Sequence, residues 1–219
     1  MNYLCDRLPW ERSLGAPLCH HCGKQRRWSD FLLMRACSHC NRKVGWRAYI
    51  VLLLSLGFSL FLLKYGIWHF LILEYFLLVA MMDIEHRVIL HPVSIAGAIL
   101  AVTGGVQMHG WLSTILGGVI GGSLMAIFYL AGLYYGRWVA KRQNLEQAEE
   151  GLGFGDVTLS FILGLALGAS SILAGLTLGI FLAGIFSLGY LLLTRQSANQ
   201  ATIPYAPFLL IGAALLLVR

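Results

Sequence analysis

The chain has 219 residues, of which 58% are hydrophobic and only 12% are charged, and its mean hydropathy is +0.73. This composition excludes an ordinary soluble domain, because a surface that faces water needs a much larger share of charged residues. The formal net charge of +6 does not by itself indicate nucleic-acid binding, since basic residues also gather beside the membrane segments of integral proteins. We therefore expect a protein of the lipid bilayer that binds no nucleic acid.

The chain begins with a basic region and continues with a long apolar one. Nine of its sixteen Lys and Arg residues precede Ala48. We interpret residues 1–47 as a cytoplasmic region and residues 48–219 as a membrane domain. Residues 1–9 contain no apolar run long enough for a signal peptide, so the internal apolar segments are expected to drive membrane insertion.

Seven segments are apolar enough to form helices that cross a bilayer, for which about 20 residues are needed and shorter stretches are tolerated. They cover residues 48–63, 67–82, 92–108, 111–135, 157–168, 171–193 and 203–218. Glycines that let another helix approach closely recur in two of them, namely Gly117, Gly118, Gly121 and Gly122, and Gly175, Gly179 and Gly184. The sequence predicts an all-α polytopic membrane bundle of about seven transmembrane helices.

The distribution of positive charge predicts which side of the membrane each loop occupies. Lys and Arg in short loops remain on the cytoplasmic side. If the N-terminus is cytoplasmic, fourteen basic residues lie inside, and only Lys64 and Arg219 lie outside. Asp83 then ends the second segment at the cytoplasmic face, and Asp156 precedes the fifth segment at the same face. Glu74 lies nine residues before Asp83 on roughly the opposite side of the helix, and we expect it to make a polar contact within the bundle.

Two Cys-x-x-Cys hooks lie in the basic region with 14 residues between them, and they contribute Cys19, Cys22, Cys37 and Cys40. Two such hooks are typical of a tetrahedral zinc site, and four thiolates leave no open position for a substrate or water. We therefore predict a structural zinc, with the neighbouring histidines facing solvent and Cys5 as an unpaired extra. The alternative is four thiols, reduced or joined in disulfides, that bind no metal.

The two aspartates are the residues to which we assign chemistry. Acids within membrane segments are costly, so each one favours a functional hypothesis, although an isolated acid could simply pair with a nearby arginine. Two carboxyl groups close enough to share a proton can hydrolyse a peptide, because an ionised one activates water while its protonated partner polarises the carbonyl. Gly153 and Gly155 precede Asp156 and leave room for an extended peptide.

The run 153–157 (GFGDV) resembles the Gly-x-Gly-Asp motif of the type IV prepilin peptidases, a family of membrane aspartyl proteases. Residues 83–87 (DIEHR) resemble its first aspartate motif, the cysteine hooks resemble its cytoplasmic zinc region, and residues 204–208 (PYAPF) resemble its final-helix motif. The resemblance covers nearly the whole chain in order. It differs in three places: the family's usual first spanning helix is missing, so that seven helices replace eight, Thr158 stands where many relatives have Lys, and Ala206 where Gly is common.

The resemblance implies a multi-pass protein of the bacterial inner membrane whose catalytic residues are Asp83 and Asp156. It implies as partners the prepilins or pseudopilins of type IV pilus and type II secretion systems, cut after a glycine where a basic cytoplasmic leader meets an apolar stalk. Many members of the family also methylate the new N-terminus with S-adenosylmethionine. We find no motif for that cofactor, so methylation stays open, and loss of methylation without loss of cleavage after Cys19→Ala and Cys22→Ala would support it.

Two functions of other classes remain as alternatives. Intramembrane acids such as Glu74 could belong to a proton- or cation-coupled transporter, although we detect no inverted repeat. The zinc region could instead anchor a scaffold for pilus assembly. A scaffold would tolerate Asn at both aspartates, whereas a peptidase would not.

Overall fold

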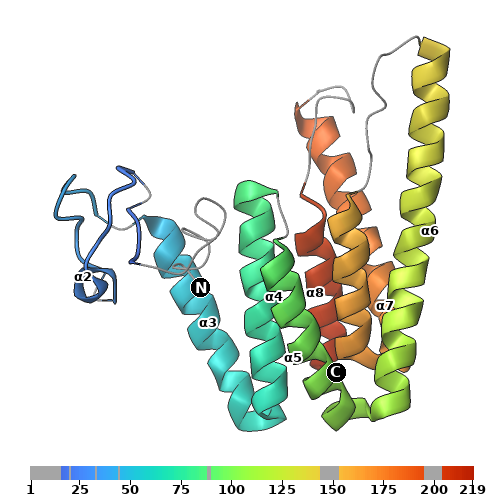
Figure 1. The fold of residues 1–219 in the computed structure, drawn as a ribbon, viewed down its shortest axis with the longest axis horizontal. Helices are drawn as coiled ribbons and strands as arrows, with labels where there is room; N and C mark the ends of the chain where they lie inside the picture. The colour runs from blue at the N-terminus through green and yellow to red at the C-terminus, as the bar shows by residue number, and fades with distance from the viewer. Residues whose placement is uncertain are drawn as a thin grey trace. The chain divides into compact units, whose positions relative to one another are not determined.

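The computed structural model describes residues 16–19, 21–32, 34–43, 45–87, 90–143, 153–194 and 204–219 (Figure 1). The helices of this part of the chain are α2 (Trp28–Leu32), α3 (Trp46–Tyr65), α4 (Ile67–His86), α5 (His91–His109), α6 (Trp111–Gln143), α7 (Phe154–Thr194) and α8 (Ala206–Leu217). An isolated bridge joins Leu18 to Gln25, and the described residues form no strand. The all-α prediction is confirmed.

The chain divides into two compact units, Met1–Leu90 and His91–Arg219. The first unit holds the cysteine hooks, α2, and the helices α3 and α4, which are joined by a single turn at Gly66. The second unit holds α5 to α8, and within it α6 packs most extensively on α7 and α7 on α8. Each unit is described below by itself.

The helices are apolar both where they face the protein and where they do not. Four of them are long and apolar enough to cross a membrane: α4, α5, α6 over Trp111–Val139 and α7 over Phe154–Leu193. Ala48–Leu60 of α3 and the whole of α8 are shorter apolar helices. Large apolar side chains also lie on the outside, as at Leu53, which is 66% exposed, and Leu193, which is 87% exposed. A helix that is apolar all round is suited to lipid, so a polytopic membrane bundle is confirmed.

The long helix α7 contains a sharp turn at Gly168. The backbone of this residue (φ 71°, ψ 171°) is not helical, and glycine occupies that region without strain. Figure 1 shows the second half of α7 returning beside the first, so two of the predicted segments, 157–168 and 171–193, correspond to the two halves of one element. His109 Nε2 donates to Ala166 O at 3.1 Å and Ala169 N donates to Ser113 Oγ at 3.1 Å, which satisfies backbone groups on both sides of the turn.

The glycines of α6 allow its backbone to touch the first half of α7. A Cβ built on Gly164 would collide with the carbonyl of Gly117, and one on Gly121 would collide with the carbonyl of Ser160. In the second half of α7, a Cβ on Gly179 would collide with the backbone of Leu209 in α8 in the same way, whereas one on Gly175 would press on the Leu167 side chain and make only ordinary contact with Ala213 of α8. The packing role predicted for these glycines is confirmed at these positions, whereas at Gly184 an added Cβ would meet nothing within 4 Å among the described residues.

This packing leads to a prediction about stability. Gly164→Ala is expected to destabilise the protein by about 1–3 kcal/mol, because the new methyl group needs space that the Gly117 backbone occupies. Gly132→Ala in α6 is the matched control: its Cβ would meet nothing within 4 Å, and Ala favours a helix by about 1 kcal/mol over Gly. Thermal unfolding in detergent measures both variants. Equal behaviour of the two variants would contradict the packing role of Gly164.

Candidate functional site

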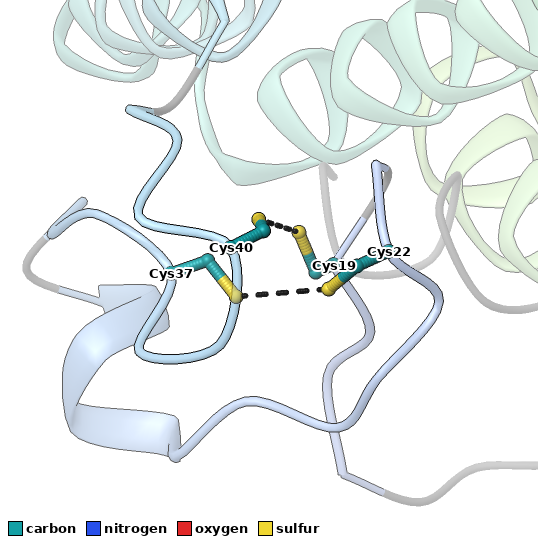
Figure 2. A group of neighbouring side chains, drawn as sticks. All are labelled: Cys19, Cys22, Cys37 and Cys40. Carbon is teal, nitrogen blue, oxygen red and sulfur yellow. Dashed lines mark hydrogen bonds between the residues drawn. The ribbon is translucent and has the colours of Figure 1, made fainter.

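The four hook cysteines lie together in the first unit (Figure 2). Their Sγ atoms are all within 4.8 Å of one another, with 3.6 Å between Cys19 and Cys40 and 3.9 Å between Cys22 and Cys37. These separations are far longer than a sulfur–sulfur bond of about 2.05 Å, and all four cysteines are free. The group could hold a metal ion such as zinc, as predicted, and the disulfide alternative is not the one that the structure adopts.

The two hooks have the same backbone structure, which explains why the thiols converge. In each hook the first cysteine donates its N–H to the carbonyl five residues on, and the residue four places on donates back to that cysteine. The four bonds are Cys19 N to Lys24 O (2.9 Å), Gly23 N to Cys19 O (2.8 Å), Cys37 N to Arg42 O (3.0 Å) and Asn41 N to Cys37 O (2.8 Å). The turn residues Gly23 (φ 66°) and Asn41 (φ 51°) are left-handed, a conformation that Gly and Asn tolerate best.

Backbone groups also prepare one thiol of the cluster for metal binding. The backbone N–H groups of Cys40 and His39 lower the pKa of Cys37 to about 6, because they stabilise its thiolate. At Cys40 the backbone of Arg42 acts in the same direction, but burial and the neighbouring thiols outweigh it and raise the pKa to about 11. Four thiols this close cannot all be thiolates without a cation between them, which fits a site for a divalent metal.

His21 and His39, the described histidines beside the cysteines, do not belong to the cluster. His21 and His39 are exposed, as predicted, and His21 Nδ1 lies 3.2 Å from Arg42 NH1. His20 and Cys5 lie outside the described residues. Among the described residues, the candidate metal ligands are therefore the four cysteines alone.

Asp83 lies in the last turn of α4, in the first unit. Its side chain is 9% exposed, and its backbone carbonyl accepts from Arg87 N at 2.9 Å, where the left-handed Arg87 (φ 52°) ends the helix. The next residues bring further polar groups, with His86 Nε2 at 3.8 Å from Glu85 Oε2. A buried carboxyl group is thus placed at the end of a membrane helix.

Glu74 has a different role in the same helix. Ser55 Oγ of α3 donates to Glu74 Oε1 at 2.7 Å, so this carboxyl group is used in joining α3 to α4. The predicted polar contact within the bundle is confirmed.

Asp156 is the third residue of α7, in the second unit. Its Oδ2 accepts the N–H of Gly153 at 3.3 Å, and its own N–H donates to Gly153 O at 3.0 Å. A carboxylate in this position satisfies a free donor at the start of a helix and lies at the positive end of the helix dipole. Gly153 is exposed and Gly155 is half-buried, so Phe154 brings the only side chain among residues 153–155, the described residues directly before Asp156.

Tyr205 lies near Asp156, and no role was predicted for it from the sequence. It immediately precedes α8, and burial together with the nearby Asp156 carboxylate raises the pKa of Tyr205 to about 12. The signal available in the sequence was only its position in the run 204–208. Asp83 and Asp156 belong to different units, and their pairing stays a prediction.

The helices and the cysteine cluster define a polytopic helical membrane protein with a candidate metal site outside its apolar segments. A model of the type IV leader peptidase family matches residues 69–188, more than half of the chain and a range that includes both aspartates. The chain therefore belongs to the type IV leader peptidase family and is a peptidase. No curated protein and no solved structure matches it.

Proposed function

We propose that the chain is a prepilin leader peptidase whose catalytic pair is Asp83 and Asp156. The family match across both residues carries this proposal, and the position of Asp156 at a helix N-terminus behind two glycines supports it. The substrate is a prepilin or pseudopilin with a basic leader and an apolar stalk, cut after a glycine at the boundary between them. An extended segment of this kind fits the chain before Asp156, where the two glycines leave the approach open.

The ends of the two helices suggest different roles for the two acids. The positive end of α7 and the Gly153 N–H favour a charged carboxylate at Asp156, so we assign to it the activation of water. The negative end of α4 favours a neutral carboxyl group at Asp83, which would polarise the scissile carbonyl. Water attacks the carbonyl carbon and gives its proton to Asp156, and the same proton then passes to the amine as the peptide bond breaks.

The charges of α6 support the orientation that the sequence predicts. Arg137, Lys141 and Arg142 are all exposed at the C-terminal end of α6, the helix contains no acid, and Arg142 lies over the Trp138 ring at 4.1 Å from its centroid. Figure 1 shows that α7 begins at this same end of the unit, and the ring of Tyr129 in α6 contacts that of Phe154. Basic and aromatic residues gather where a helix leaves the bilayer on the cytoplasmic side. We infer that Asp156 faces the cytoplasm of a bacterial inner membrane.

We further propose that the four cysteines hold zinc as a structural ion. Two matched hooks and four converging sulfurs support this ion, and with four thiolate ligands it would supply a rigid fold and no catalytic position. Methylation of the new N-terminus with S-adenosylmethionine stays a prediction, since no contact in the described residues bears on it.

Cleavage of a purified substrate tests the proposed function. The full chain, reconstituted in phospholipid vesicles, is incubated with a prepilin, and the new N-terminus is identified by mass spectrometry. We expect a single cut after the glycine at the end of the leader and no cut when that glycine is replaced by a bulky residue. The chain that carries both Asp83→Asn and Asp156→Asn is the control. Processing of the prepilin by this double variant would contradict the proposed function.

A further inference from the structure

The helices of the second unit bring the start of α8 to the start of α7. Leu167 of the first half of α7 and Ala213 of α8 both lie against Gly175, so these residues are at one level. The first half of α7 and α8 run in the same direction from the same end of the unit (Figure 1). The residues that precede this level on both helices therefore lie side by side.

From the contact of Leu167 and Ala213 with Gly175, we can compare how far Asp156 and Tyr205 lie toward the N-terminal ends of their helices. Asp156 comes 11 residues before Leu167, or about 16 Å along a helix, and Tyr205 comes eight residues before Ala213, or about 12 Å. The backbone of Tyr205 is helical in conformation (φ −93°, ψ −37°), so the same rise applies to it. Side chains of a helix point back toward its N-terminus, which directs the ring of Tyr205 toward the level of Asp156.

The electrostatic relation between the two groups agrees with this geometry. The Asp156 carboxylate is close enough to Tyr205 to disfavour loss of the phenolic proton, and burial acts in the same direction. The phenol therefore remains an O–H donor throughout the pH range of a peptidase assay. The Oδ2 atom of Asp156 already accepts from Gly153 N, so a second donor would fix the carboxylate at both ends.

We propose that Tyr205 is a positioning residue for Asp156, and that its phenolic O–H donates to the Asp156 carboxylate when the substrate fills the site. This inference rests on the proposed function. With Gly153 N on one side and the phenol on the other, the carboxylate is held in one orientation in which it can accept the proton of the attacking water. In enzymes without bound substrate, catalytic hydrogen bonds are often long or poorly aligned, and they shorten when the substrate binds. The residue acts through Asp156 and does not itself exchange a proton with the substrate.

Tyr205→Phe tests this role because it removes only the hydroxyl group. We expect kcat for prepilin cleavage to fall by about 10-fold to 100-fold, the effect of losing one hydrogen bond to a charged group, with KM within twofold of the unchanged protein. The thermal unfolding temperature is expected to stay the same. Tyr205→His, which retains an N–H donor, is expected to recover part of the lost kcat.

Tyr129→Phe is the matched control, because it removes a hydroxyl group at the same end of the unit from a ring that contacts Phe154. It is expected to leave kcat unchanged. An unchanged kcat for Tyr205→Phe, in a preparation where Asp156→Asn is inactive, would overturn the inference. So would an effect confined to KM, which assigns Tyr205 to substrate binding, or a loss of folded protein, which assigns it to stability. Cleavage by Asp156→Asn would overturn the proposed function instead.

Discussion

Asp156→Asn and Asp83→Asn are each expected to lower the rate of prepilin cleavage by a factor of about 10³ or more. The change keeps the size of each side chain but removes the group that titrates. At Asp156 it removes the base that takes the proton of water, and at Asp83 the acid that polarises the carbonyl. Since both residues serve the same step, the double variant is expected to be no slower than the slower single variant. Initial rates on a purified prepilin measure this.

Glu74→Gln provides the matched control for Asp83→Asn, because it makes the same chemical change in the same helix. Gln keeps the oxygen that accepts the proton of Ser55 Oγ, so the contact between α3 and α4 survives. We expect Glu74→Gln to retain its cleavage rate and its amount of protein in the membrane. Full cleavage by either aspartate variant would disprove the dyad. A lost rate in Glu74→Gln would show that the effect of such a change is not specific to the proposed catalytic pair.

Cys37→Ser is expected to release the bound metal and to unfold the cysteine region while cleavage continues. Structural zinc contributes about 10–16 kcal/mol to small domains of this kind, and Ser is a poor substitute for a thiolate. Cys37 is the most buried of the four thiols, at 1% exposed, and its neighbouring amides favour the charged form. Metal analysis of the purified chain is expected to give about one zinc per chain before the change and none after it.

The control for this experiment is Cys5→Ser, which removes a thiol that belongs to neither Cys-x-x-Cys hook of the sequence. It is expected to leave the zinc content unchanged. A zinc content that is unaffected by Cys37→Ser would contradict the tetrahedral site, and a cleavage rate that falls in step with the metal would contradict its purely structural role. Limited proteolysis of residues 16–43 distinguishes loss of metal from loss of the region's fold.

The sequence predicted the helices well because lipid imposes a simple requirement. A segment must be apolar over about 20 residues and must satisfy its own backbone hydrogen bonds, and both requirements can be read residue by residue. The cysteine cluster was predictable for a similar reason, since a two-residue gap fixes the geometry of each hook locally. The second hook, however, depends on Asn41 as the left-handed residue where the first has Gly23, and the sequence alone did not single it out.

Some features were decided by contacts between distant parts of the chain. The break predicted between residues 157–168 and 171–193 falls at Gly168, but the side chains that hold this turn, His109 and Ser113, come from more than 50 residues earlier. The importance of Gly164 likewise depends on the Gly117 backbone, whereas an added Cβ at Gly184 would meet nothing within 4 Å among the described residues. Spacing in the sequence cannot distinguish a glycine that helix packing requires from one that it does not, because the requirement comes from the backbone of the partner helix.

The sequence by itself determined that this is an integral membrane protein, that four cysteines could bind one metal ion and that Asp83 and Asp156 are the acids to test. Hydropathy, charge and local spacing are properties of neighbouring residues, and they act before any helix has packed. The tertiary structure decided which side chains hold the turn at Gly168 and that the start of α8 lies beside the start of α7. This arrangement of α7 and α8 results from the close packing of glycine backbones, and it places Tyr205 near Asp156.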